Sequence, residues 1–157
     1  MAKVMFICTA NICRSPMAEK FFEQRLKQRN LTDRHQVSSA GTWPPREGLP
    51  ADPTVVQILQ EQYGLSLEDH HSKEITKEMI TDQDIILVME KNHREALQVE
   101  FYEKYDQIFL LSEMIGQEFD IADPHHRSKK EYEMAVQQIQ QIIEYGFDEI
   151  LKRTASE

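Results

Sequence analysis

The sequence predicts an α/β domain in which helices cover a parallel β-sheet. Short apolar segments such as "KVMFI" (3–7) and "DIILVM" (84–89) have the uninterrupted apolar character of strands that are buried on both faces. Segments with helical periodicity follow them, and this alternation of strand and helix is typical of parallel sheets. The length of 157 residues suits one domain, which we expect to span residues 1–157.

The first strand (3–7) is expected to lead through a short loop into a helix over residues 16–29. Ser15 can cap this helix, and Pro16 suits its first turn. The helical spacing of its apolar residues predicts one buried face. That face would carry Met17, Phe21, Phe22 and Leu26.

A second strand, "QVSSAG" (36–41), is expected before a loop rich in proline, "TWPPREGLP" (42–50). The next helix is predicted over "DPTVVQILQEQYG" (52–64). Asp52 would cap it, Pro53 would occupy its first position, and Gly64 would end it.

The second half of the chain is expected to supply two more strands and a long final helix. The third strand is "DIILVM" (84–89), and the fourth is "QIFLL" (107–111). The final helix is predicted from about residue 128 to 151, and the last residues, "RTASE" (153–157), are expected to form a tail. The buried side of that helix would carry Tyr132, Val136, Ile139, Ile143 and Ile150.

The composition argues against two classes of partner. The formal net charge is −9, whereas proteins that bind nucleic acid cluster lysine and arginine against the phosphate backbone. The longest apolar runs are far too short to span a bilayer, so no membrane partner is expected. The N-terminus shows no secretory signal, and a cytoplasmic location is the default expectation.

The loop "CTANICRSP" (8–16) has the residues needed to bind and attack a phosphate group. Backbone N–H groups between a buried strand and a helix N-terminus converge on one point, where an anion binds. Arg14 adds a planar fork of donors for two phosphate oxygens. The same positive potential would stabilise a thiolate at Cys8, to which Ser15 can donate a hydrogen bond.

Other kinds of site fit these residues less well. A Cys-x5-Arg pattern alone occurs often by chance, and a buried cysteine is commonly only a small apolar residue. The loop contains neither Gly-Lys-[Ser/Thr] nor glycine, which excludes a Walker loop and a dinucleotide fingerprint. The histidine pairs at 70–71 and 125–126 have no accompanying carboxylate cluster, and adjacent side chains point apart. We therefore expect neither a metal nor a cofactor.

The loop "CTANICRSPMAE" resembles the signature loop of the low-molecular-weight protein tyrosine phosphatases. The likeness covers nearly the whole chain, and it implies a flavodoxin-like fold with a four-stranded parallel sheet of order 2-1-3-4 and helices on both faces. Five further segments occur in that family's order and spacing: "SSAGT" (38–42), "ADP" (51–53), "GLSLEDHHSKEI" (64–75), "DIILVMEKNHREAL" (84–97) and "DIADP" (120–124).

The resemblance implies hydrolysis of phosphotyrosine in proteins through a phosphocysteine intermediate. Cys8 would be the nucleophile and Arg14 would hold the charge of the transition state. Asp123, between the fourth strand and the last helix, is the family's general acid by position. The phosphate-binding loop would also contain Thr9, Ala10, Asn11, Ile12, Cys13 and Ser15.

Supporting residues are implied in the same way. In similar proteins a serine and a histidine bond the residue that corresponds to Asn11, and these map onto Ser39 and His70. Cys13 would either form a protective disulfide with Cys8 under oxidation or only fill space. Ala10 replaces the glycine of most relatives, which would cost about 1 kcal/mol if this position requires a positive φ.

The substrate pocket is expected to have apolar and aromatic walls. Relatives usually carry a tyrosine directly after Asp-Pro, but this chain has His125 and His126 there. Trp43 is a candidate for a second wall, and Ile12 for the floor. Similar enzymes that cleave phosphoarginine carry a threonine in place of Ile12, so Ile12 favours phosphotyrosine.

Three alternatives remain open from the sequence. One is a phosphatase for phosphoarginine or another phosphomonoester. Another is an arsenate reductase on the same fold, which would need an external thiol because no cysteine follows Cys13. The third is a non-catalytic phosphate-binding module. The expected partner is a tyrosine-phosphorylated protein, and the chain is expected to be a monomer or a weak dimer.

Overall fold

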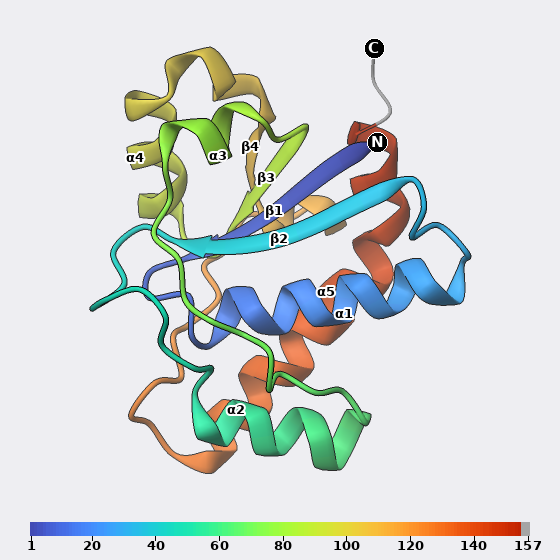
Figure 1. The fold of residues 1–157 in the computed structure, drawn as a ribbon, viewed down its shortest axis with the longest axis vertical. Helices are drawn as coiled ribbons and strands as arrows, with labels where there is room; N and C mark the ends of the chain where they lie inside the picture. Colours follow the sequence, from blue (N-terminus) through green and yellow to red (C-terminus); the bar gives the residue numbers. More distant parts are fainter. Residues whose placement is uncertain (155–157) are drawn as a thin grey trace.

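The computed structural model describes residues 1–154 and contains one parallel sheet of four strands. The strand order is β2-β1-β3-β4, which confirms the flavodoxin-like order predicted from the resemblance (Figure 1). All three strand pairs are parallel. The strands are β1 (Ala2–Cys8), β2 (His35–Gly41), β3 (Ile85–Val88) and β4 (Ile108–Leu110), each within two residues of its predicted ends.

Helices cover both faces of the sheet. α1 (Arg14–Gln28) and the long α5 (Lys129–Thr154) pack on one face and on each other, while α3 (Lys77–Thr81) and α4 (Lys91–Glu100) lie on the other (Figure 1). α2 (Pro53–Ile58) packs against α5 at the end of the molecule far from α3.

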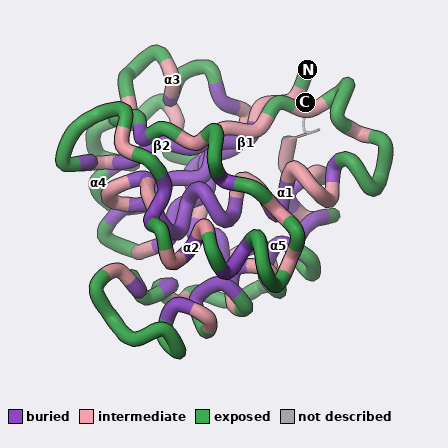
Figure 2. Tube along the Cα trace, turned by 60° about the horizontal axis from the view of Figure 1, so that its bottom comes forward, coloured by how far each residue is buried: buried purple, intermediate pink, exposed green. Residues whose placement is uncertain are grey.

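The side chains of the central strand alternate between two hydrophobic cores. Val4 and Phe6 of β1 belong to the core beneath α1 and α5, and Met5 and Ile7 belong to the core beneath α3 and α4. The buried segments gather in the middle of the molecule, around the sheet (Figure 2). This two-sided burial explains why the strand is apolar without interruption. The residues predicted for the buried faces of the first and last helices are all buried.

The start of α1 differs from the prediction. The helix begins at Arg14, and its N-cap is Cys13, which makes no capping hydrogen bond with its side chain. Ser15 was predicted to cap this helix, but it lies inside the first turn, where its hydroxyl faces Cys8. The first turn thus begins directly at the end of the loop, where a helix N-terminus offers N–H groups that have no partner within the helix.

The predicted ends of the second helix are confirmed. Asp52 caps α2, because its Oδ1 accepts hydrogen bonds from the N–H groups of Thr54 at 2.8 Å and Val55 at 3.4 Å. After α2 the chain continues as a π-helical turn, Leu59–Tyr63. This helical segment ends at Gly64, which has a φ of +67°. Glycine suits this left-handed position because it has no Cβ.

Several elements were not predicted. They are α3, α4 and the 3-10 helices Tyr102–Gln107 and Leu111–Ile115. α5 continues through Arg153 and Thr154, which contradicts the predicted tail at these two positions; residues 155–157 of that tail lie outside the described residues. Within residues 1–154, no helix combines the length and the apolar character needed to cross a membrane.

Candidate active site

The loop 9–13 connects the C-terminal end of β1 to the N-terminus of α1 and places Cys8 at its base. Cys8 is the last residue of β1 and is buried, and its Sγ lies 3.0 Å from the hydroxyl oxygen of Ser15. In open α/β folds this edge of the sheet is where ligands bind. The N-terminus of a fifteen-residue helix contributes partial positive charge at the same place.

Asn11 holds the loop in its shape through contacts from four directions. Its φ is +60°, a left-handed conformation that asparagine tolerates better than most residues. Its side chain donates to the hydroxyls of Ser15 at 2.8 Å and Ser39 at 3.0 Å and accepts from the Lys73 N–H at 3.0 Å. The Nε2 of His70 donates to its carbonyl oxygen at 2.6 Å. Burial lowers the pKa of His70, which favours the neutral ring.

The left-handed position of the loop is therefore Asn11 and not Ala10. Ala10 is not among the residues with positive φ in the described chain, so the strain considered for an alanine at this position does not arise. The buried Ser39 connects this hydrogen-bond network to α1, because its hydroxyl donates to Glu19 at 2.7 Å.

Arg14 is buried and held in place before any ligand arrives. Its Nη1 donates to Glu90 Oε2 at 2.5 Å and to the carbonyl oxygen of Ile121 at 2.7 Å. Its Nε is buried and finds no hydrogen-bond partner within residues 1–154, and Arg14 lines the small cavity above Cys8. A tetrahedral oxyanion in this cavity would give that donor an acceptor.

Asp123 reaches the same cavity from the loop before α5. Its Oδ2 lies 3.8 Å from Arg14 Nη2, and its Oδ1 accepts a hydrogen bond from the His125 N–H at 3.0 Å. The side chain is about half exposed, as a group that exchanges protons with a substrate and with water needs to be. The structure thus brings Asp123 to Cys8 and Arg14 from a distant part of the chain.

The predicted pocket walls are only partly assembled. Ile12 and His125 line the cavity together with Cys8, but Trp43 and His126 do not belong to its lining. Trp43 is 80% exposed. The ring of His126 packs on the ring of His125, with centroids 3.7 Å apart, so His126 contacts a lining residue without lining the cavity itself.

The two cysteines differ in their surroundings. Both are free thiols and both are buried. Burial raises the pKa of the Cys13 thiol far above its usual range, and the negative charges of Asp52 and Asp123 add to that effect. Cys13 therefore stays protonated at neutral pH in this structure, which leaves Cys8 as the candidate nucleophile.

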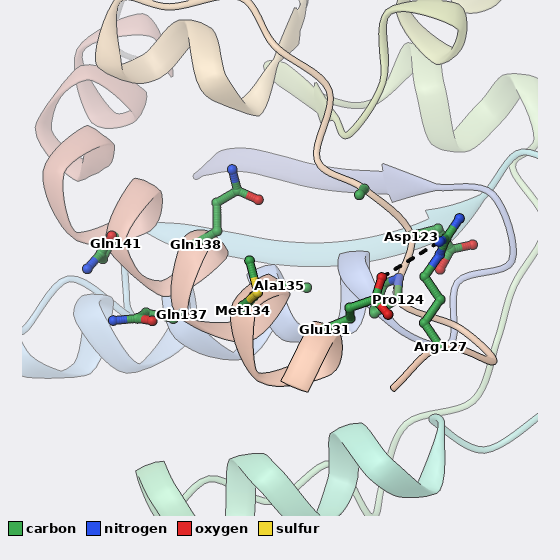
Figure 3. Close-up of a pocket in the computed structure, with 10 residues that line it drawn as sticks. Asp123, Pro124, Arg127, Glu131, Met134, Ala135, Gln137, Gln138 and Gln141 are labelled. Atoms are coloured by element: carbon green, nitrogen blue, oxygen red, sulfur yellow. Dashed lines mark ion pairs between the residues drawn. The ribbon is translucent and has the colours of Figure 1, made fainter. Parts of the chain in front are cut away.

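A wider groove of about 350 Å³ lies beside Asp123 and Pro124, against the first turns of α5 (Figure 3). Arg127 and Glu131 form an ion pair at its edge, with 3.6 Å between Nη1 and Oε2. Its lining includes neither Cys8 nor Arg14, so this groove is not the phosphate pocket, although Asp123 borders both.

Sequence reasoning missed three residues that support the site. Glu90 anchors Arg14, Glu19 anchors Ser39, and the buried His93 bonds the hydroxyl of Thr9 at 2.9 Å through its Nε2. Glu90 and His93 lie just after β3, at the carboxyl edge of the sheet. The rule that ligands bind at that edge is the signal that could have found them.

Comparison with known proteins identifies the family. The profile described as "Low molecular weight phosphotyrosine protein phosphatase" matches residues 3–156, nearly the whole chain. The chain belongs to this family. A protein of Ralstonia nicotianae described as the probable low molecular weight protein-tyrosine-phosphatase EpsP is 32% identical over 141 residues, which cover 90% of each chain.

Two further relatives are named for different substrates, tyrosine and arginine. A crystal structure of a low molecular weight protein tyrosine phosphatase from T. tengcongensis superposes with a TM-score of 0.88 at 32% identity and covers 95% of this phosphatase and 99% of that chain. The protein-arginine-phosphatase of Bacillus subtilis is 30% identical over 141 residues, which cover 89% of this phosphatase and 91% of that protein.

Gly41, the last residue of β2, lies directly beneath the phosphate-binding loop. A Cβ at this position would lie 2.6 Å from the carbonyl oxygen of Thr9 and 3.1 Å from the carbonyl carbon of Ala10. We expect Gly41→Ala to displace the loop, to lower the free energy of unfolding by about 1–3 kcal/mol, and to weaken vanadate binding. Urea denaturation and vanadate titration measure the two effects.

Gly146→Ala is a matched control for this prediction. Its Cβ would lie 2.9 Å from Met114 Cβ, a similar clash in a helix that packs away from the loop. This variant should lose stability and keep its affinity for vanadate. Equal vanadate affinity in Gly41→Ala and the unmodified phosphatase would show that Gly41 does not determine the shape of the loop.

Proposed function

We propose that this phosphatase hydrolyses phosphotyrosine in proteins through a covalent phosphocysteine intermediate. In the first step the Cys8 thiolate attacks phosphorus, an S–P bond forms and the P–O bond to the tyrosine ring breaks. Protonated Asp123 gives its proton to the leaving phenol oxygen. The loop N–H groups and Arg14 hold the charge that develops on the transferring phosphoryl group.

The second step returns the enzyme to its starting state. The Asp123 carboxylate takes a proton from water, the water oxygen attacks phosphorus and the S–P bond breaks. Inorganic phosphate leaves, and Cys8 is a thiolate again. One carboxyl group thus acts first as an acid and then as a base, with no net gain or loss of protons on the protein.

The observation that carries this proposal is the convergence on one small cavity of a buried thiol, an anchored arginine and a carboxyl group. Cys8, Arg14 and Asp123 all line it, and the Arg14 Nε is directed to no protein acceptor among residues 1–154. Ser15 Oγ, 3.0 Å from Cys8 Sγ, can stabilise the thiolate and later the leaving sulfur. A module that only binds phosphate would need neither the thiol nor the carboxyl group.

Asp123→Asn tests the role of the acid. With an aryl phosphate ester as substrate we expect kcat to fall about 100-fold, because the leaving phenolate no longer receives a proton. The unmodified phosphatase should show a bell-shaped pH profile, since the thiolate and the protonated carboxyl group must coexist. The variant should lose the basic limb of this profile, which depends on the carboxyl proton.

A different outcome would contradict the assignment of Asp123. If the unmodified phosphatase kept a flat rate from about pH 4 to about pH 9, no such pair of groups would be acting. Glu131→Gln is a suitable control, because Glu131 lies near Asp123 at the edge of the wider groove and outside the phosphate pocket.

Phosphoarginine is the second candidate substrate, since one relative is named as a protein-arginine-phosphatase. Ile12 favours the flat ring of phosphotyrosine, because its branched side chain lines the pocket beside Cys8. Initial rates on phosphotyrosine and phosphoarginine peptides of the same sequence decide between the two. A thiolate mechanism also requires a reducing compartment, and we therefore propose a cytoplasmic location.

A further inference from the structure

A second cluster of reactive side chains adjoins the cavity above Cys8. Cys13 from the loop, Asp52 from the start of α2 and His125 from the loop before α5 bring three potential metal ligands within 4.8 Å of one another. Asp52 and Cys13 are buried, and His125 is partly exposed. The sequence argued against a metal at the paired histidines, but this set joins three distant segments and uses only one member of a pair.

The distances between the ligand atoms resemble those around a tetrahedral zinc ion. Zinc bonds of about 2.3 Å to sulfur and about 2.0 Å to nitrogen and oxygen place sulfur about 3.5 Å from the other two atoms and those two about 3.3 Å apart. Cys13 Sγ lies 3.5 Å from Asp52 Oδ2 and 4.0 Å from His125 Nδ1, and the last two atoms are 2.8 Å apart. Each of the three distances therefore needs to change by no more than about 0.5 Å to match the zinc geometry.

Asp52 is oriented for this role by the helix that it caps. Its Oδ1 is engaged by the N–H groups of Thr54 and Val55, which leaves Oδ2 facing Cys13 and His125. The Tyr132 hydroxyl donates to the same Oδ2 at 2.8 Å. It would orient the carboxylate without binding the metal itself. Burial alone would raise the pKa of Asp52, but hydrogen bonds from Tyr132 and His125 outweigh it and lower the pKa.

The charge balance of the cluster also fits a cation. Asp52 is a buried carboxylate that contacts the imidazole of His125, and among residues 1–154 no lysine or arginine is paired to it. Buried carboxylates require a positive partner, and a divalent cation is the strongest available. One sulfur, one nitrogen and one oxygen ligand are the mixed set that suits zinc, whereas calcium and magnesium prefer oxygen alone.

We propose that Cys13, Asp52 and His125 form a zinc-binding site that joins the phosphate-binding loop to the loop of the general acid. Zinc replaces the thiol proton of Cys13, which passes to solvent, and His125 binds as the tautomer protonated on Nε2. Water completes the coordination. Because Cys13 and His125 also line the phosphate pocket, bound zinc narrows that pocket and inhibits turnover reversibly.

Metal titration in a Cys8→Ser background tests this proposal without any catalytic readout, so it is independent of the proposed phosphatase reaction. Removing Cys8 leaves Cys13 as the only thiol of the chain. Addition of Co²⁺ should produce the near-ultraviolet absorption of a cobalt–thiolate bond and the visible bands of tetrahedral cobalt, and Zn²⁺ should displace both. Zinc at about 100 times its Kd should raise Tm by about 5–10 °C.

Three further variants in the same background identify the ligands. Cys13→Ser should lose the thiolate absorption, and His125→Asn should lose the tetrahedral bands and the rise in Tm. His126→Asn is the matched control and should keep all three, since asparagine tolerates the positive φ of +66° at this position. Circular dichroism verifies that each variant is folded.

The proposal is wrong if the Cys8→Ser protein shows no cobalt–thiolate absorption. It is equally wrong if His125→Asn retains the tetrahedral bands and the zinc-dependent rise in Tm. Asp52→Ala is not used, because loss of the α2 cap would itself destabilise the protein by about 1 kcal/mol.

Discussion

Cys8→Ser is expected to reduce kcat with an aryl phosphate about 10,000-fold or more. The serine hydroxyl is a far weaker nucleophile than the thiolate of the proposed mechanism, which Ser15 Oγ, 3.0 Å from Cys8 Sγ, would stabilise. The pocket itself should remain, because the serine side chain fits the space of the cysteine. Vanadate or phosphate should therefore still bind to the variant, as isothermal titration calorimetry can measure.

Cys13→Ser provides the comparison within the same loop. Its thiol is kept protonated by burial and by Asp52, so the loss of activity should be far smaller than in Cys8→Ser. Rapid-quench mass spectrometry should find phosphate on Cys8 in the unmodified enzyme. Equal losses in the two variants, or a phosphate trapped on Cys13, would contradict the division of labour between the two thiols.

Arg14→Lys is expected to have the second-largest effect, a fall in kcat of about 1,000-fold. Lysine keeps the positive charge, but it lacks the planar fork that donates to Glu90 and to the Ile121 carbonyl and that, in the proposed mechanism, also holds the phosphate. The buried Nε donor, which has no protein acceptor among residues 1–154, disappears as well. The kcat from steady-state kinetics and the affinity for vanadate should fall together, since both depend on oxyanion recognition.

Arg94→Lys is the control for this substitution. Arg94 also pairs with two carboxylates, those of Glu113 and Glu118, but it does not line the phosphate pocket. This variant should keep nearly all activity. If Arg14→Lys retained more than about a tenth of the activity, a point charge would suffice and the bidentate role would be disproved.

The sequence predicted the elements that have strong local signals. Uninterrupted apolar runs located β1, β3 and β4, and Asp52, Pro53 and Gly64 marked both ends of the second helical segment. The start of α1 was placed two residues too late, because Ser15-Pro16 has the composition of a cap even though the helix begins at Arg14. α4 was missed because most of its residues are polar, with only His93 and Leu97 buried.

The candidate site was predictable to the extent that it lies in one short segment or matches a known family. Cys8, Arg14 and the helix after them are neighbours in sequence, and the resemblance supplied Asp123. The partners of these residues come from elsewhere: Glu90 is 76 positions from Arg14, and His93 is 84 positions from Thr9. Their contacts depend on the order of the strands in the sheet, which a local pattern does not contain.

The anchoring of Asn11 has a consequence for how such an enzyme can diverge. The loop that would bind the anion is tied through Asn11 to Ser39 of β2 and to the segment that carries His70 and Lys73. His125, which lines the cavity beside Cys8, lies on a different loop, the one before α5. Mutation can therefore exchange the group that carries the phosphate while the chemistry is inherited intact, and a single ancestral scaffold can give rise to descendants that act on different amino acids.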